Sequence, residues 1–179
     1  MTDYFATFGE PRRPWLDPEK LKEKYFAFAR ERPTDAELNE AFRILSDPRL
    51  RLRHFLGLEG VDLNAGREVP AGLAELFWNS GMLLREIDRW LEQCGEAQSA
   101  LARALLRGQR AKLELRLQDL EQALASRYEA EVTALRALKI SSPVSPNETK
   151  DLVRRHDALS YLSRLREQGQ ERKFRLDHA

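Results

Sequence analysis

The chain has only one cysteine, Cys94, among its 179 residues, and this excludes an internal disulfide or a metal site built from several thiolates. It also lacks an uninterrupted run of about 18 apolar residues, so no segment has the pattern of a transmembrane helix. Neither sign of charge is in excess, because the chain has 30 basic and 29 acidic residues. The net charge therefore does not favour nucleic acid or a membrane as a partner. Pro11 and Pro14 break the N-terminal segment, which does not resemble a secretory signal. We therefore expect a cytoplasmic protein without membrane contact.

Sequence motifs for catalysis are also missing. The chain has no Gly-rich phosphate loop, no closely spaced set of metal ligands and no nucleophile elbow. Its three histidines, His54, His156 and His178, lie far apart, and His156 falls on an apolar helical stripe, where a hydrogen-bonded core histidine is expected. Cys94 has no neighbouring basic cluster to activate its thiol. We expect neither an enzyme nor a bound cofactor or metal.

Helical spacing dominates what is present. Apolar residues recur at steps of three and four, whereas the alternation typical of a half-buried strand is almost absent, so we predict an all-α protein. Asp17, Asp35 and Asp47 are expected N-caps, and two of them precede a proline at the first helical position. These signals predict N-terminal helices over residues 3–8, 17–32 and 35–46, and a fourth that begins at Pro48 and ends near Gly57.

Three longer helices are predicted in the rest of the chain, over residues 73–93, 96–138 and 146–168, with a frayed basic tail after them. Ser145 and Glu148 form a capping box at the start of the last helix. Gly108 indicates a kink or a close contact in the middle one. That helix also carries a regular apolar seam, typical of a bundle or coiled coil, at Leu113, Leu117, Leu120, Leu124, Tyr128, Val132, Leu135 and Leu138.

The domain boundaries are expected where this helical pattern stops. Gly66, Pro70 and Gly72 fall in a stretch with few large apolar side chains, which is typical of a linker. We predict an N-terminal domain of residues 1–60, a linker of residues 61–72 and a C-terminal domain of residues 73–179.

The N-terminal residues resemble a known co-chaperone module. Tyr4-Phe5, Phe8-Gly9 and a helix centred on Tyr25, followed by NEAFRILSDP at residues 39–48, are similar to a J-domain. The arginine-rich continuation to Gly60 resembles the HscB-type co-chaperones of iron–sulfur cluster assembly. The resemblance implies a J-domain-like helical hairpin followed by an antiparallel three-helix bundle domain. It also implies a seventy-kilodalton heat-shock ATPase as the partner of the first domain.

One departure from that family concerns its trigger motif. The loop that should hold His-Pro-Asp holds Pro33-Thr34-Asp35, without the histidine, and the segment from there to Asn39 is shorter than in the family. We therefore expect no ordinary stimulation of the chaperone ATPase. The resemblance and the basic helix before the loop give a chaperone-binding candidate set, whose alternative is a solvated face with interleaved glutamates: Lys20, Lys22, Lys24, Arg30, Arg32, Pro33 and Asp35.

The resemblance extends to the C-terminal part. Leu84-Arg85-Glu86 is similar to the first helix of the family's three-helix domain, which binds the iron–sulfur scaffold protein. Carried over by position, the scaffold-binding residues are Trp78, Met82, Leu83, Glu86 and Ala158. Core packing is the alternative for Trp78 and Met82, and exposure distinguishes the two.

These patterns give a first hypothesis and one alternative. The first is an HscB-like co-chaperone or adaptor that binds an iron–sulfur scaffold or client protein. The alternative is a diverged helical structural protein that forms a homodimer through the seam of residues 113–138. Nucleic-acid binding through Arg49, Arg51, Arg53 and the basic tail is not expected, because aromatic residues are not interleaved with these cations.

Overall fold

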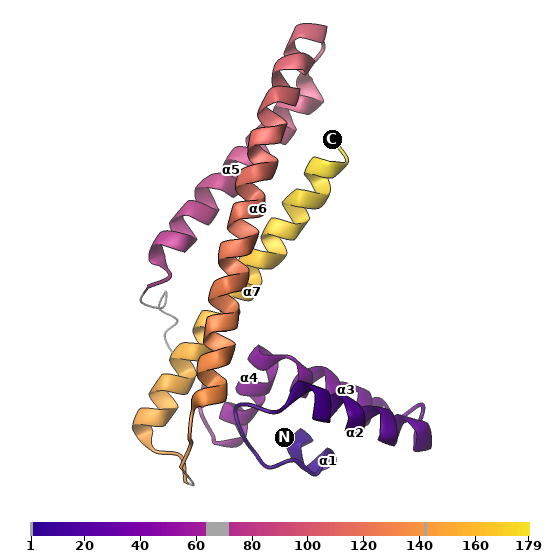
Figure 1. Ribbon diagram of the computed structural model, residues 1–179, viewed down its shortest axis with the longest axis vertical. Coiled ribbons are helices and arrows are strands. Elements are labelled where there is room, and N and C mark those ends of the chain that lie inside the picture. Colours follow the sequence, from indigo (N-terminus) through magenta and orange to yellow (C-terminus); the bar gives the residue numbers. More distant parts are fainter. Residues whose placement is uncertain (1, 64–71, 142) are drawn as a thin grey trace. The chain divides into compact units, whose positions relative to one another are not determined.

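The computed structural model describes residues 2–63, 72–141 and 143–179, and within these ranges the chain is entirely α-helical, with no strand (Figure 1). The all-α prediction is therefore confirmed. In chain order the helices are α1 (Tyr4–Thr7), α2 (Pro18–Glu31), α3 (Ala36–Ser46), α4 (Pro48–Leu58), α5 (Ala74–Glu96), α6 (Ala100–Ala137) and α7 (Pro146–Asp177).

An aspartate begins each of the first four helices. The carboxylates of Asp3, Asp17, Asp35 and Asp47 accept hydrogen bonds from backbone N–H groups in the first turn of α1, α2, α3 and α4. These N–H groups have no acceptor inside the helix, so the capping carboxylate supplies the hydrogen-bond acceptor that the helix backbone lacks. The expected caps at Asp17, Asp35 and Asp47 are confirmed.

The capping box of α7 is also confirmed. Ser145 Oγ accepts from the Glu148 N–H (3.3 Å), and the Glu148 carboxylate accepts from the Ser145 N–H (2.7 Å). Hydrogen bonds from Ser141 and Ser145 lower the pKa of Glu148 to about 2.

Tertiary contacts divide the chain into two compact units, which differ from the predicted domains. Unit 1 comprises residues 1–68 and 131–159, and unit 2 comprises residues 69–130 and 160–179. The length of α6 and α7 is the physical reason, because helices of 38 and 32 residues extend about 57 and 48 Å and contribute to both units. Of the predicted linker, residues 64–71 lie outside the described residues.

Unit 1 has an aromatic core between short helices. The Tyr25 ring of α2 stacks on the Phe42 ring of α3, with centroids 4.1 Å apart, and Tyr25 Oη donates to Asn39 Oδ1 (2.8 Å). The buried apolar side chains of the N-terminal helices include Phe5, Phe8, Leu21, Leu38, Leu45, Leu52, Phe55 and Leu56.

A buried arginine completes the core of unit 1. Arg51 of α4 is only 2% exposed, and its guanidinium donates to the carbonyl oxygens of Pro14 (3.0 Å) and Leu45 (2.6 Å). Leu45 lies in the last turn of α3, where carbonyls lack helical partners and the helix dipole favours a cation. Arg51 is therefore a structural residue, whereas Arg53, two residues further along α4, is exposed to solvent.

Unit 2 packs α5 against the first part of α6 and the end of α7. Trp90 Nε1 donates to the carbonyl oxygen of Leu106, which joins α5 to α6. The seam leucines of α6 are buried, so the surface that the homodimer alternative required is already covered in the folded chain. The buried core of this unit includes Leu83, Leu84, Ile87, Trp90, Leu113, Leu117, Leu120 and Leu124.

Two predicted helix ends were wrong, and one alternative for Gly108 is excluded. The helix α5 continues through Cys94 and Gly95 to Glu96. The helix α7 continues nine residues past Gln168 to Asp177, because Arg172 and Lys173 pair with acids on α5 and α6 and Leu176 is fully buried. A side chain at Gly108 would meet no atom within 4 Å, so no close contact explains this glycine.

Candidate protein-docking site

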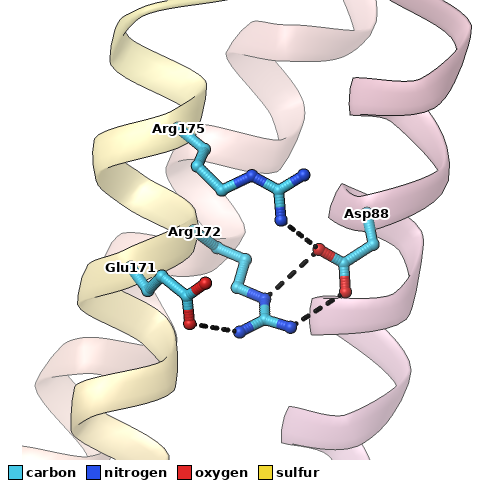
Figure 2. Close-up of polar contacts among 4 residues, drawn as sticks. All are labelled: Asp88, Glu171, Arg172 and Arg175. Carbon is cyan, nitrogen blue, oxygen red and sulfur yellow. Dashed lines mark hydrogen bonds and ion pairs between the residues drawn. The ribbon is translucent and has the colours of Figure 1, made fainter.

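Ion pairs fix the orientation of α5 from both sides. Asp88 accepts from Arg172 Nε (3.3 Å) and Nη2 (3.1 Å) and from Arg175 Nη1 (3.3 Å), both on α7, and Arg172 also pairs with Glu171 (2.9 Å) (Figure 2). On the opposite flank, Glu86 pairs with Arg116 of α6 at 2.7 Å. The face of α5 between these two flanks is consequently held toward solvent.

Large apolar side chains cover that outward face. Trp78 and Met82, four residues apart and therefore neighbours on one side of the helix, are 65% and 44% exposed. Phe77 is 45% exposed and contacts the Tyr161 ring edge-on, with centroids 6.3 Å apart. We call Phe77, Trp78 and Met82 the α5 surface. Large apolar side chains that are exposed close together are typical of a protein-binding site.

The predicted scaffold-binding residues do not all lie on this surface. Trp78 and Met82 do, and Glu86 borders it with a side chain that is half exposed but paired with Arg116. Leu83 and Ala158 are buried, Leu83 among the core leucines of unit 2 and Ala158 in unit 1, so both contribute to packing. Phe77 is not among the predicted site residues, because its position between the apolar residues Leu76 and Trp78 gives no signal of its exposure.

The predicted chaperone-binding residues lie on α2 and in the loop that follows it. Lys20, Lys22, Arg30 and Pro33 are exposed. The other three make local contacts. Lys24 binds the Phe8 carbonyl oxygen and the Glu10 carboxylate, Arg32 lies over the Phe28 ring and 3.4 Å from the Asp35 carboxylate, and Asp35 caps α3.

Among the described residues, few titratable side chains could take part in a reaction, and they lie far from one another. The His54 ring is buried beside Tyr4 and Phe5, its Nε2 accepts from the Tyr4 N–H (3.2 Å), and burial lowers its pKa. Burial raises the pKa of the Cys94 thiol, which makes it less reactive. In the described ranges no three His, Cys, Asp or Glu side chains gather as metal ligands would. Nor does any helix seen there have both the length and the apolarity needed to cross a bilayer.

Comparison with known proteins then gives the family. No family model matches the sequence. The co-chaperone protein HscB homologue of Bordetella pertussis is 30% identical over 135 residues, which cover 65% of this chain and 75% of that protein. The chain belongs to the HscB co-chaperone family. The HscB homologue of Vibrio cholerae is 28% identical over 116 residues, covering 55% of the chain and 67% of that protein.

A solved structure of the chaperone HscB from Vibrio cholerae aligns over 94% of this chain and 96% of its own, at a TM-score of 0.45 and 17% identity. The assignment to the HscB family rests on the sequence relatives alone. In this HscB family member the described residues expose the apolar α5 surface in unit 2 and the cations of α2 in unit 1.

Proposed function

We propose that this HscB family member is an adaptor of iron–sulfur cluster assembly. It binds a scaffold or client protein through the α5 surface and does not stimulate a seventy-kilodalton chaperone ATPase in the ordinary way. It carries out no reaction itself, and the cytoplasmic location expected from the sequence stays a prediction.

The exposure of Trp78 and Met82 is the observation that supports scaffold binding. Large aromatic and thioether side chains are enriched at the centres of protein interfaces, where truncation of one of them costs about 2 kcal/mol or more. The exposed charged side chains of Arg85 and Glu86 lie about one turn beyond Met82, at the position of a polar rim beside an interface core. Since both flanks of α5 are held by ion pairs, the surface needs little reorganisation before it binds.

The loop after α2 supports the second half of the proposal. The sequence there has no histidine, and the one aspartate, Asp35, already accepts the Leu38 N–H at 3.0 Å and pairs with Arg32. A carboxylate used as a helix cap is not free to act on a partner without loosening the start of α3.

Binding to the scaffold is tested with a double variant, Trp78→Ala with Met82→Ala, by calorimetric titration of the purified iron–sulfur scaffold from the same cell. We expect the affinity to fall at least tenfold. Phe174→Ala is the matched control, because Phe174 is 64% exposed in the same unit but lies on α7, and it should leave the affinity unchanged. Failure of the wild-type chain to bind the scaffold would refute this half of the proposal.

The absence of ordinary ATPase stimulation is tested separately. The steady-state ATP hydrolysis of the cognate chaperone is measured with and without this chain, and a J-domain co-chaperone that has an intact His-Pro-Asp motif serves as the positive control. We expect the chain to leave the rate within about twofold of the basal rate. Stimulation comparable to that of the control would show that the histidine is not required here.

A further inference from the structure

The helix α6 is apolar on two opposite sides over residues 101–115. Its inner side carries Leu113 into the core of unit 2. On the outer side, Leu101, Leu105 and Leu115 are 72%, 63% and 60% exposed. An apolar side of a helix is normally covered by a neighbouring element. Among the described residues, nothing buries the leucines of this outer side.

The exposed leucines form one continuous stripe. At about 100° per residue, Leu101, Leu105, Gly108 and Leu115 fall with Ala104 and Ala111 within about 120° of the helix circumference, and Lys112 is the one charged residue in the same arc. The stripe extends for about 21 Å along the axis, which is about four turns. Gln118 and Asp119 then end it. This pattern is that of a helix-binding face rather than of scattered surface leucines.

The charges beside the stripe indicate what covers it. Residues 101–116 contain the cations Arg103, Arg107, Arg110, Lys112 and Arg116 against a single acid, Glu114. Arg110 pairs with Glu114, and Arg116 pairs with Glu86. Among the described residues Arg107 and Lys112 have no ion-pair partner, and Arg103 donates only to the Gln98 carbonyl oxygen. A second copy of the chain would bring the same cations against them, which disfavours self-association.

We propose that the stripe of α6 is a second docking site, distinct from the α5 surface, and that it binds an acidic amphipathic helix of a partner protein. The leucines of the partner lie on Leu101, Leu105 and Leu115, and its carboxylates face Arg103, Arg107 and Lys112. Gly108 lies midway along the stripe, and the open space around its Cβ position leaves room there for a side chain of the partner helix.

The test uses two synthetic helical peptides of about 18 residues, or five turns, with leucines on one face. One has glutamates on its other face and the second has lysines. Binding to the full chain is followed by fluorescence anisotropy at low and high salt. We expect the acidic peptide to bind and the basic peptide to bind at least tenfold more weakly, with the affinity of the acidic peptide falling as salt rises.

Variants locate the binding. Leu101→Ala with Leu105→Ala, and separately Arg103→Glu with Arg107→Glu, should each weaken the acidic peptide at least tenfold. Gly108→Gln should weaken it by obstruction while Gly108→Ala does not, and both should fold at least as well as wild type because the position is open. Phe174→Ala, which removes an exposed ring from α7, and Trp78→Ala are the controls that should have no effect.

Several results would overturn the proposal. Equal binding of both peptides, or loss of binding in the Trp78→Ala control, would show that the stripe does not select an acidic helix. Leucine-dependent binding to phosphatidylserine vesicles without peptide binding would identify a membrane surface instead. A dimer in sedimentation that Leu105→Ala dissolves would identify a second copy as the occupant.

Discussion

The buried guanidinium of Arg51 gives the sharpest test of how unit 1 is held together. Arg51→Met keeps much of the side-chain length but leaves the carbonyl oxygens of Pro14 and Leu45 without their donors. A buried carbonyl that loses its hydrogen bond costs about 1–3 kcal/mol, and the lost donor here is charged, which places each loss toward the upper part of that range. Methionine also removes the free-energy cost of burying the charged guanidinium, and this gain offsets part of the loss. We expect a net destabilisation of about 3 kcal/mol.

Urea unfolding followed by circular dichroism measures this loss. With a denaturant slope of about 1.5 kcal/mol/M, a loss of about 3 kcal/mol lowers the midpoint of unit 1 by about 2 M. Because the chain has two units, amide hydrogen exchange of α3 and α4 is measured in parallel to assign the change to unit 1. Arg51→Lys, which keeps the charge but not the two-pronged geometry, should lose about half as much.

The matched control is Arg53→Met, because Arg53 lies two residues further along α4 and is exposed. It should change the stability by no more than about 0.5 kcal/mol. If Arg51→Met were as stable as Arg53→Met, the two hydrogen bonds would contribute nothing net and the structural role given to Arg51 would be wrong.

Three further predictions concern helix chemistry and pH. Gly108→Ala should raise the stability of unit 2 by about 0.5–1 kcal/mol in urea unfolding, and a loss would indicate a contact at this position. Ser145→Ala should destabilise the start of α7 by about 1 kcal/mol, seen as faster hydrogen exchange at Glu148, and an unchanged exchange rate would show that the serine cap contributes nothing. The pKa of His54 is lower in the folded chain than the ordinary 6.5, so the unfolded chain binds more protons. The stability that neutral His54 contributes to the folded chain is complete above about pH 6.5. As the pH falls from there toward the folded-state pKa, the free energy of unfolding decreases by up to about 1.4 kcal/mol per pH unit. His54→Phe should remove this dependence and His178→Phe, at an exposed site, should not.

The helix starts could be predicted from the sequence because their causes are local. Asp17, Asp35 and Asp47 satisfy N–H groups two or three residues away, and Ser145 and Glu148 satisfy each other within one turn. No long-range information is needed for such contacts.

Burial could not be predicted in the same way. Arg51 looks like one member of an alternating basic series, and its burial depends on a carbonyl 37 residues away. The extension of α7 depends on Arg172 reaching Asp88, 84 residues earlier. The candidate site was found only in part for the same reason. The family resemblance pointed to Trp78 and Met82, but it could not show that Leu83 is turned inward or that Phe77 is exposed.

The division of the chain into interleaved units has a consequence for its synthesis. Unit 1 needs residues 131–159 as well as residues 1–68, and the Trp15 ring packs under the guanidinium of Arg136, 5.1 Å away. The ribosome must therefore produce residues 69–159 before unit 1 can close, which takes about 5–18 s at about 5–20 residues per second. During that delay the ring contacts within the N-terminal helices, such as that of Tyr25 with Phe42, can already form, whereas the Trp15 ring has no Arg136 guanidinium to pack against.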